Sequence, residues 1–188
     1  ALYLGGQVKN PQGLFYSNPE ELSKLGATVL MKHNVQNIDN QAHTITVENL
    51  ETHEVTTSSY DKLVMTSGSW PVIPPIPGID SDKVLLCKNW AHAQELFQRA
   101  KNAKRIAVIG AGYIGAELAE AYSLKGHDVT LIDGQDRVMP KYFDTAFTDK
   151  IEDEYRSHNV RLALNQNVQG FTTTADGVTI ATDKEQID

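Results

Sequence analysis

The feature that most constrains the fold is the stretch from Arg105 to Asp133. Residues 105–109 form a short, β-branched apolar run of the kind found in buried parallel strands. The run leads directly into the pattern G-x-G-x-x-G at 110–115, and apolar residues then recur at helical spacing. A second apolar run at 129–132 precedes Asp133. This order predicts strand, turn, helix and strand, which is an α/β, Rossmann-like unit built on a parallel sheet.

Each glycine of the pattern meets a physical need of a bound dinucleotide. Gly110 permits the tight turn, Gly112 lets the backbone approach a pyrophosphate with no Cβ in the way, and Gly115 allows the helix to pack closely on the strand. The phosphates would lie against unpaired N–H groups at the positive end of a helix that starts near Ala111.

Asp133 predicts which dinucleotide is bound. It follows Gly110 by 23 residues, close to the roughly 20 expected for the acid that holds the adenosine ribose. A carboxylate there accepts hydrogen bonds from the ribose hydroxyls and repels a 2′-phosphate, so we expect NAD(H) rather than NADP(H). The alternative is a glycine-rich turn inside an ordinary α/β unit, with Asp133 as a solvated strand end.

Composition excludes several classes of function. The net charge of −7 argues against a nucleic acid or an anionic membrane as partner. The sequence contains no long apolar run for a membrane span and no secretion signal at its start. The single cysteine, Cys87, excludes an intrachain disulfide and suits a reducing cytoplasm. Because the chain begins with Ala1 and ends in a strand-like stretch, we expect a piece of a longer protein.

The first part of the chain predicts one short helix and several strands. Asn18 as the N-cap and Pro19 at the first helical position begin a helix that ends at Gly26. Strands are expected at 28–31, 35–38, 43–47, 54–57 and 63–66. The third and fourth of these alternate polar and apolar residues and predict a small antiparallel ribbon, whereas the last is expected to be buried.

A proline-rich run at 71–78 separates this part from the glycine motif. It holds four of the seven prolines, which exclude a helix or a central strand, so we expect an extended connector and a domain boundary. A short strand at 83–86 and an amphipathic helix beginning at Trp90 should follow, and the residues up to Gly6 are expected to be the tail of a helix.

Beyond the glycine motif, apolar residues at every fourth position from Phe143 to Tyr155 predict a helix with its apolar stripe inward and a solvated acidic face. A third parallel strand is expected at 160–164. The runs 168–173 and 178–182 predict a hairpin.

The sequence closely resembles the flavoprotein NADH oxidases and NADH peroxidases of the pyridine nucleotide–disulfide reductase superfamily, over essentially its whole length. The stretches that carry this resemblance are ALYLG at 1–5, YDKL at 60–63, TSG at 66–68, LCKN at 86–89, 110–117 and NVRLAL at 159–164. The last of these, together with TDKE at 182–185, is most similar to the water-forming NADH oxidases.

The resemblance implies an FAD domain with an inserted NAD domain, followed by a C-terminal dimerisation domain. It implies that 1–73 is a partial FAD-binding domain with an antiparallel ribbon and without its first glycine motif. Residues 74–103 would form a linker strand and helix, and 104–188 a C-terminally truncated NAD(H)-binding domain. The redox cysteine of the family would lie upstream of Ala1, so we expect no catalytic residue here, an inactive fragment, and a homo-oligomer when full length.

Matching positions imply two sets of cofactor-binding residues. For FAD they are Val35, Asn37, Thr66, Ser67, Gly68, Ser69 and Lys88. For NAD they are Gly110, Gly112, Tyr113, Ile114, Gly115, Glu117, Asp133 and Tyr142. The alternatives are a plain strand end and a solvated lysine in the first set, and in the second a partly exposed aromatic at Tyr113 and a glutamate that interacts with the helix dipole at Glu117.

The resemblance implies that NADH reduces FAD and that the flavin reduces oxygen to water with the upstream cysteine. An NADH peroxidase that reduces H₂O₂ is the alternative enzyme, a coenzyme A–disulfide reductase is more distant, and an isolated NADH-binding module is the non-enzyme alternative. Cys87 stands at another place in the family pattern and is expected to be a small apolar filler. The six histidines are dispersed, so no metal site is expected.

Overall fold

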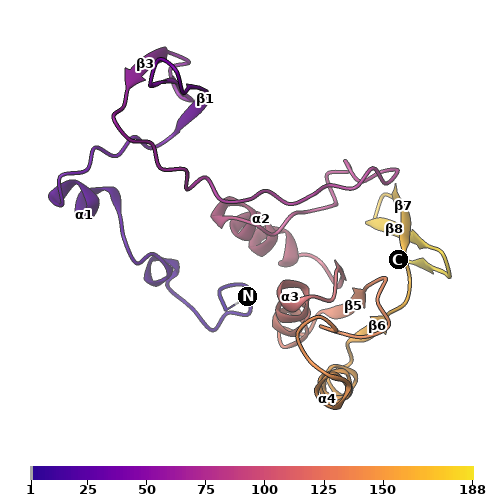
Figure 1. Ribbon diagram of the computed structural model, residues 1–188. Helices are drawn as coiled ribbons and strands as arrows, with labels where there is room; N and C mark the ends of the chain where they lie inside the picture. The colour runs from indigo at the N-terminus through magenta and orange to yellow at the C-terminus, as the bar shows by residue number, and fades with distance from the viewer. Residues whose placement is uncertain (1) are drawn as a thin grey trace. The chain divides into compact units, whose positions relative to one another are not determined.

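The computed structural model describes residues 2–188 and divides into two compact units (Figure 1). One unit comprises residues 12–69. The other comprises residues 70–188 together with the described residues up to Pro11. Each unit has its own strands, and the run 71–78 contains neither helix nor strand, as its prolines predict.

The unit of residues 12–69 begins with short helical turns. A 3₁₀ turn, η1 (Pro11–Leu14), precedes helix α1 (Pro19–Lys24). The side-chain oxygen of Asn18 accepts a hydrogen bond from the N–H of Glu21 at 2.8 Å, which caps the helix as predicted. Gly26 follows the helix with φ of +90°, a conformation that favours glycine.

The strands of this unit form one antiparallel sheet in the order β1–β2–β3, which confirms the predicted ribbon. They are β1 (His33–Asp39), β2 (Thr44–Asn49) and β3 (Val55–Ser59). The strands predicted at 28–31 and 63–66 are wrong. A buried strand needs neighbours to satisfy its backbone, and no described strand pairs with either segment, so both have irregular backbone and 63–66 is exposed.

The second unit contains a parallel sheet in the order β4–β5–β6. Its elements in chain order are β4 (Arg105–Ile109), α3 (Tyr113–Ser123), β5 (Asp128–Ile132), α4 (Thr145–Ser157) and β6 (Arg161–Ala163). Helix α3 packs on β5, as Figure 1 shows, and Leu131 and Ala119 are fully buried between them. The α/β class and the βαβ unit are therefore confirmed.

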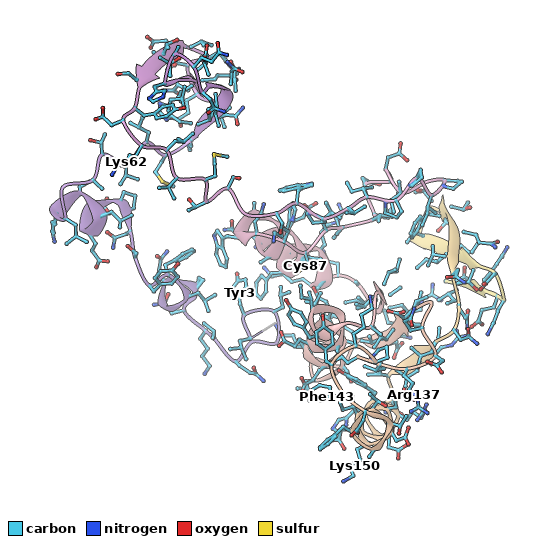
Figure 2. All side chains as sticks on the ribbon, in the orientation of Figure 1. Tyr3, Lys62, Cys87, Arg137, Phe143 and Lys150 are labelled. Atoms are coloured by element: carbon cyan, nitrogen blue, oxygen red, sulfur yellow. The ribbon has the colours of Figure 1, made fainter. Side chains whose placement is uncertain are left out.

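Helix α2 (Trp90–Ala100) directly precedes β4 in the chain, as predicted. Its residue Phe97 stacks on Tyr3, with ring centroids 4.9 Å apart. Figure 2 labels Tyr3. Residues 2–6 form turns rather than the predicted helix tail, and Ala1 lies outside the described residues. The strand predicted at 83–86 is also wrong, because no described strand pairs with it.

The end of the chain forms a second antiparallel sheet of β7 (Val168–Thr173), β8 (Val178–Thr182) and β9 (Gln186–Ile187). The predicted hairpin is confirmed, and the two-residue β9 is too short to leave a periodic pattern. Phe171 and Ile180 pack with Ile132 and Ala163, the last residues of β5 and β6. The antiparallel sheet therefore covers the carboxyl end of the parallel one.

Helix α4 differs from its prediction in two respects. It begins after Asp144, its N-cap, so Phe143 lies outside it, and Phe147 is 59% exposed. Of the four apolar residues in the predicted stripe, only Ile151 and Tyr155 pack against the core. Glu152 is 7% exposed although a solvated acidic face was expected. Its carboxylate accepts hydrogen bonds from the backbone N–H of Val138 and from Arg156, which compensate its burial.

Candidate nucleotide-binding site

The glycine turn between β4 and α3 is open on one side and tightly packed on the other. Gly110 has φ of +98°, and a Cβ at Gly110 or Gly112 would meet no heavy atom within 4 Å. A Cβ at Gly115 would lie 1.8 Å from the carbonyl oxygen of Gly110, so a larger residue would push α3 away from the turn. The open side leaves room for a group that approaches the first N–H groups of α3.

Asp133 directs its side chain towards this turn. One carboxylate oxygen accepts a hydrogen bond from the N–H of Ala111 at 2.5 Å, and the other accepts one from the N–H of Gln135 at 2.7 Å. In the parallel register Ile109 pairs with Ile132, so the turn and Asp133 leave the sheet at the same edge. The structure thus brings the glycine motif and the acid together, and the binding of ribose by Asp133 stays a prediction.

A cleft of about 260 Å³ lies at this edge. It is lined by Ile76, Ile109, Gly110, Ile132, Asp133, Gly134, Gln166, Asn167 and Val168. The carboxyl edge of parallel strands is where open α/β sheets bind ligands. Sequence reasoning missed residues 166–168, although their position just after the third predicted parallel strand was a signal for the same edge.

The remaining predicted NAD residues lie on the exposed side of the start of α3. Tyr113 and Tyr142 contact each other edge to face, with ring centroids 5.6 Å apart, and each is about half exposed. Ile114 and Glu117 are exposed on the same helix. The loop that carries Tyr142 is tied to the glycine turn by a hydrogen bond from the N–H of Met139 to the carbonyl of Ala111 at 2.8 Å.

Met139 adopts this position with φ of +53°, which is rare for a residue that is neither glycine nor asparagine. Tyr142 in turn donates its N–H to the carbonyl of Met139 at 3.0 Å. A locally unfavourable backbone conformation therefore lies in the turn that places Tyr142 beside Tyr113.

The predicted FAD residues are exposed and are divided between the two units. Val35 and Asn37 lie on β1, next to a register shift in its pairing with β2. The backbone of 66–69 is irregular and exposed. Both groups belong to the unit of residues 12–69, whereas Lys88, also exposed, belongs to the other unit. The FAD-binding role of these residues stays a prediction.

Cys87 packs against the buried cluster beneath α2 and α3 (Figure 2). Burial raises the pKa of its thiol, so the thiolate that a redox or nucleophilic role requires is disfavoured at neutral pH. These surroundings agree with the expected role of an apolar filler.

A larger cavity of about 350 Å³ lies between α3 and α4 and is lined by residues such as Leu124, Met139, Ile151 and Tyr155. None of its lining residues belongs to the glycine turn, so the smaller cleft is the better candidate for a dinucleotide. Among residues 2–188 no cluster of three metal-ligating side chains occurs. Over the same residues no helix is both long enough and apolar enough to cross a membrane.

Comparison with known proteins gives consistent matches along the whole chain. The family model for pyridine nucleotide-disulphide oxidoreductases matches residues 4–188. The NADH oxidase of Enterococcus faecalis is 56% identical over 177 residues, which are 94% of this chain and 40% of that protein. The chain thus spans about two fifths of the length of this relative.

Solved structures match equally well. The water-forming NADH oxidase from Lactobacillus brevis bound to NADH is 68% identical with a TM-score of 0.97, covering 100% of this chain and 42% of that one. An engineered NADPH oxidase made from it by five substitutions, bound to NADPH, has a TM-score of 0.97, 67% identity and the same coverage. CoADR-RHD of Bacillus anthracis is more distant, with 27% identity, a TM-score of 0.91 and coverage of 99% and 34%. The chain belongs to the pyridine nucleotide-disulphide oxidoreductase family.

Proposed function

We propose that this chain is the NADH-binding central part of an FAD-dependent NADH oxidase that reduces oxygen to water. The observation that carries the proposal is the placement of an open glycine turn and the Asp133 carboxylate on one cleft at the carboxyl edge of the parallel sheet. The NADH oxidases at 56% and 68% identity support the choice of reaction.

The residues of the cleft, of the start of α3 and of the loop that carries Tyr142 fit the parts of NADH. The N–H groups of the glycine turn and the start of α3 receive the pyrophosphate, and the helix dipole stabilises its charge. Asp133 accepts hydrogen bonds from the adenosine ribose, Tyr142 lies along the adenosine, and Tyr113 and Glu117 face the nicotinamide end. When bound, NADH and FAD supply the transfer of a hydride and the electrons that reduce oxygen. This chain orients the nicotinamide and excludes water.

The preference for NADH over NADPH has a further support. Three of the five positions substituted in the engineered NADPH oxidase are a glycine, an aspartate and a proline. Their separations along the chain equal those of Gly115, Asp133 and Pro140 here. The engineered enzyme has lost that aspartate, which agrees with Asp133 as the group that repels a 2′-phosphate.

For the full-length protein we propose FAD as the second cofactor, with Val35, Asn37, residues 66–69 and Lys88 contributing to its site. We propose that the domains follow the boundaries 1–73, 74–103 and 104–188. A redox cysteine upstream of this chain would complete the reaction, and the protein would act as a cytoplasmic homo-oligomer without nucleic-acid or membrane partners.

The test compares two electron acceptors on the full-length protein. NADH consumption should require oxygen and produce no accumulating peroxide. Consumption that proceeds without oxygen but requires added H₂O₂ would instead identify a peroxidase. The 188-residue chain alone should bind NADH and show no turnover, and NADH oxidation by it would contradict the proposed dependence on the upstream cysteine.

A further inference from the structure

The loop between β5 and α4, residues 133–144, contains neither helix nor strand and carries two residues of the candidate site, Asp133 and Tyr142. The middle of this β5–α4 loop lies in the core, since Val138 is 0% exposed. A buried backbone N–H group needs a hydrogen-bond acceptor within the protein. The group that accepts from Val138 therefore helps to fix the conformation of the whole loop.

The acceptor for Val138 comes from α4. One carboxylate oxygen of Glu152, Oε1, accepts the N–H of Val138 at 3.1 Å, and the other, Oε2, accepts Nη2 of Arg156 at 2.8 Å. Glu152 is buried, whereas the side chain of Arg156 is 54% exposed. The bond to Val138 is thus the one that lies away from water, and a carboxylate acceptor makes it stronger than a bond between neutral groups.

The next residue of the loop is held by a different element. The N–H of Met139 donates to the carbonyl of Ala111 in the glycine turn at 2.8 Å, and Ala111 is 1% exposed. Two consecutive peptide groups therefore connect the loop to α4 and to the glycine turn. A shift of Val138 away from Glu152 would also move Met139 and the turn residues that follow it.

Arg137 makes a second contact between the loop and α4. It donates to the hydroxyl of Thr148 at 3.2 Å and to the carboxylate of Asp149 (Figure 2). The side chains of Arg137 and Asp149 are 33% and 61% exposed. Because this ion pair is open to water, it restrains the loop less than the buried bond from Val138 to Glu152.

Under the proposed function, the same loop contacts the coenzyme. By the separations along the chain used above, three of the five positions substituted in the engineered NADPH oxidase fall at residues 134, 135 and 140. Glu152 itself does not line the cleft. It can therefore affect a nucleotide in the cleft only through the loop.

We propose that Glu152 is a positioning residue for the coenzyme, whose carboxylate holds the backbone of Val138 and so keeps the β5–α4 loop in the conformation that receives the adenosine half of NADH. The inference rests on the proposed binding of NADH and adds to it a residue of the core. Without this acceptor the buried N–H of Val138 would be unsatisfied, and the loop would leave the glycine turn to reach water. NADH would then have to order the loop as it binds, which lowers its affinity.

The first experiment measures Kd for NADH and for ADP-ribose, which lacks the nicotinamide, by isothermal titration calorimetry. It uses the 188-residue chain well below the melting temperature of each variant. Glu152→Ala should raise both Kd values by the same factor, about ten-fold, because the loop serves the half of NADH that the two ligands share. Glu152→Gln should stay within about two-fold of the original, because its amide oxygen still accepts the N–H of Val138.

Two further variants complete this experiment. Glu152→Met fills a similar space without an acceptor, so it should raise both Kd values as the alanine variant does, and it replaces that variant if the latter does not fold. Asp153→Ala removes the neighbouring carboxylate of α4, whose side chain is 81% exposed. This matched control should change neither Kd by more than about two-fold.

The second experiment separates a positioning role from a loss of overall stability. In the absence of nucleotide, hydrogen exchange of the amides of Val138 and Met139 should be at least about ten-fold faster in Glu152→Ala than in the original chain, with exchange in β5 unchanged. Glu152→Gln should keep the original rates. Exchange that accelerates by the same factor in the loop and in β5 would show a loss of global stability alone and would contradict the positioning role.

The outcomes separate this inference from the proposed function. If the unaltered chain binds NADH but the folded alanine or methionine variant leaves both Kd values unchanged, the role of Glu152 is wrong and NADH binding stands. The same conclusion follows if Glu152→Gln weakens binding as much as Glu152→Ala. If the unaltered chain binds neither nucleotide, the proposed function fails and this inference fails with it.

Discussion

Two apolar runs of this chain have nearly the same local sequence pattern and different structures. Residues 105–109 lead into the glycine turn and form β4, where Val108 is 8% exposed. Residues 63–66 lead into Ser67 and Gly68, yet they form no strand, and Val64 is 79% exposed. The difference lies in what each run can pair with.

The first run pairs with β5 along its entire length, so the backbone groups that face β5 are hydrogen-bonded, and Val108 packs in the core. The second run has no strand beside it within the described residues. A β-branched run therefore forms a strand only where another segment lies beside it and hydrogen-bonds to its backbone. The unit of residues 70–188 contains the strands that pair with this run, which is why a local pattern was enough to predict β4.

The same substitution in both runs tests whether they differ in burial. Val108→Ala should lower the free energy of unfolding by about 2 kcal/mol, because it removes buried methyl groups and leaves a cavity. Val64→Ala should change it by less than about 0.5 kcal/mol, because the side chain is already in water. Urea denaturation of both variants measures the difference, and equal losses would show that residues 63–66 are buried in solution.

The two runs also differ in what lies beside the turn that follows them. Only the turn after residues 105–109 is faced by an acid, Asp133. Asp133→Ala should raise the Kd for NADH by about ten-fold, the equivalent of one charge-assisted hydrogen bond. Asp128→Ala, at the other end of β5 and exposed, is the matched control and should leave the Kd within about two-fold of the original. Titration calorimetry distinguishes them, and an unchanged Kd for the Asp133 variant would remove this residue from the ribose site.

A smaller effect is expected at Tyr155 of α4, whose side chain is hydrogen-bonded to α3. The hydroxyl of Tyr155 donates to the carbonyl of Ala116 at 2.9 Å, so Tyr155→Phe should cost about 1 kcal/mol of stability at neutral pH. Phe143→Leu, at a side chain 46% exposed, is the control and should cost less than about 0.5 kcal/mol.

Two buried tyrosines, Tyr122 and Tyr155, predict that the stability of the chain depends on pH. Burial raises the pKa of Tyr122 to about 12 and that of Tyr155 to about 12, from 10.0. The unfolded chain therefore loses these protons first, and the contribution of the two tyrosines to the free energy of unfolding should stay constant below pH 10 and fall as the pH rises from 10 towards 12. Urea denaturation at several pH values measures this slope. A Tyr155→Phe variant with an undiminished slope would show that Tyr155 does not contribute.

Elements that depend on local signals were predictable from the sequence. The helix begun by Asn18, the three parallel strands and the hairpin of β7 and β8 each carry their signal within a few residues, as a cap, a glycine or an apolar period. The strand predictions at 28–31, 63–66 and 83–86 were wrong because a strand needs a partner segment, and the local sequence does not show whether one lies beside it. The prediction that Glu152 is solvated was wrong for a related reason, because its partner Val138 belongs to a loop that only the folded chain brings near.

The candidate site also contains residues that local spacing predicts and residues that depend on tertiary pairing. Gly110 and Asp133 were predictable because their spacing reflects one βαβ unit, and the structure places both on one cleft. Asn167 was missed because it reaches the cleft only through the pairing of β6 with β5, and its orientation depends on Asp183 in a third segment. Local spacing therefore identified the turn and the acid, and tertiary pairing supplied the opposite wall.

A crystal structure of the chain with NADH tests the proposed nucleotide site most directly. We expect the pyrophosphate to lie against the turn at 110–115 and a ribose hydroxyl of the adenosine to donate to Asp133. A nucleotide bound in the cavity between α3 and α4, or one with its ribose away from Asp133, would contradict this expectation.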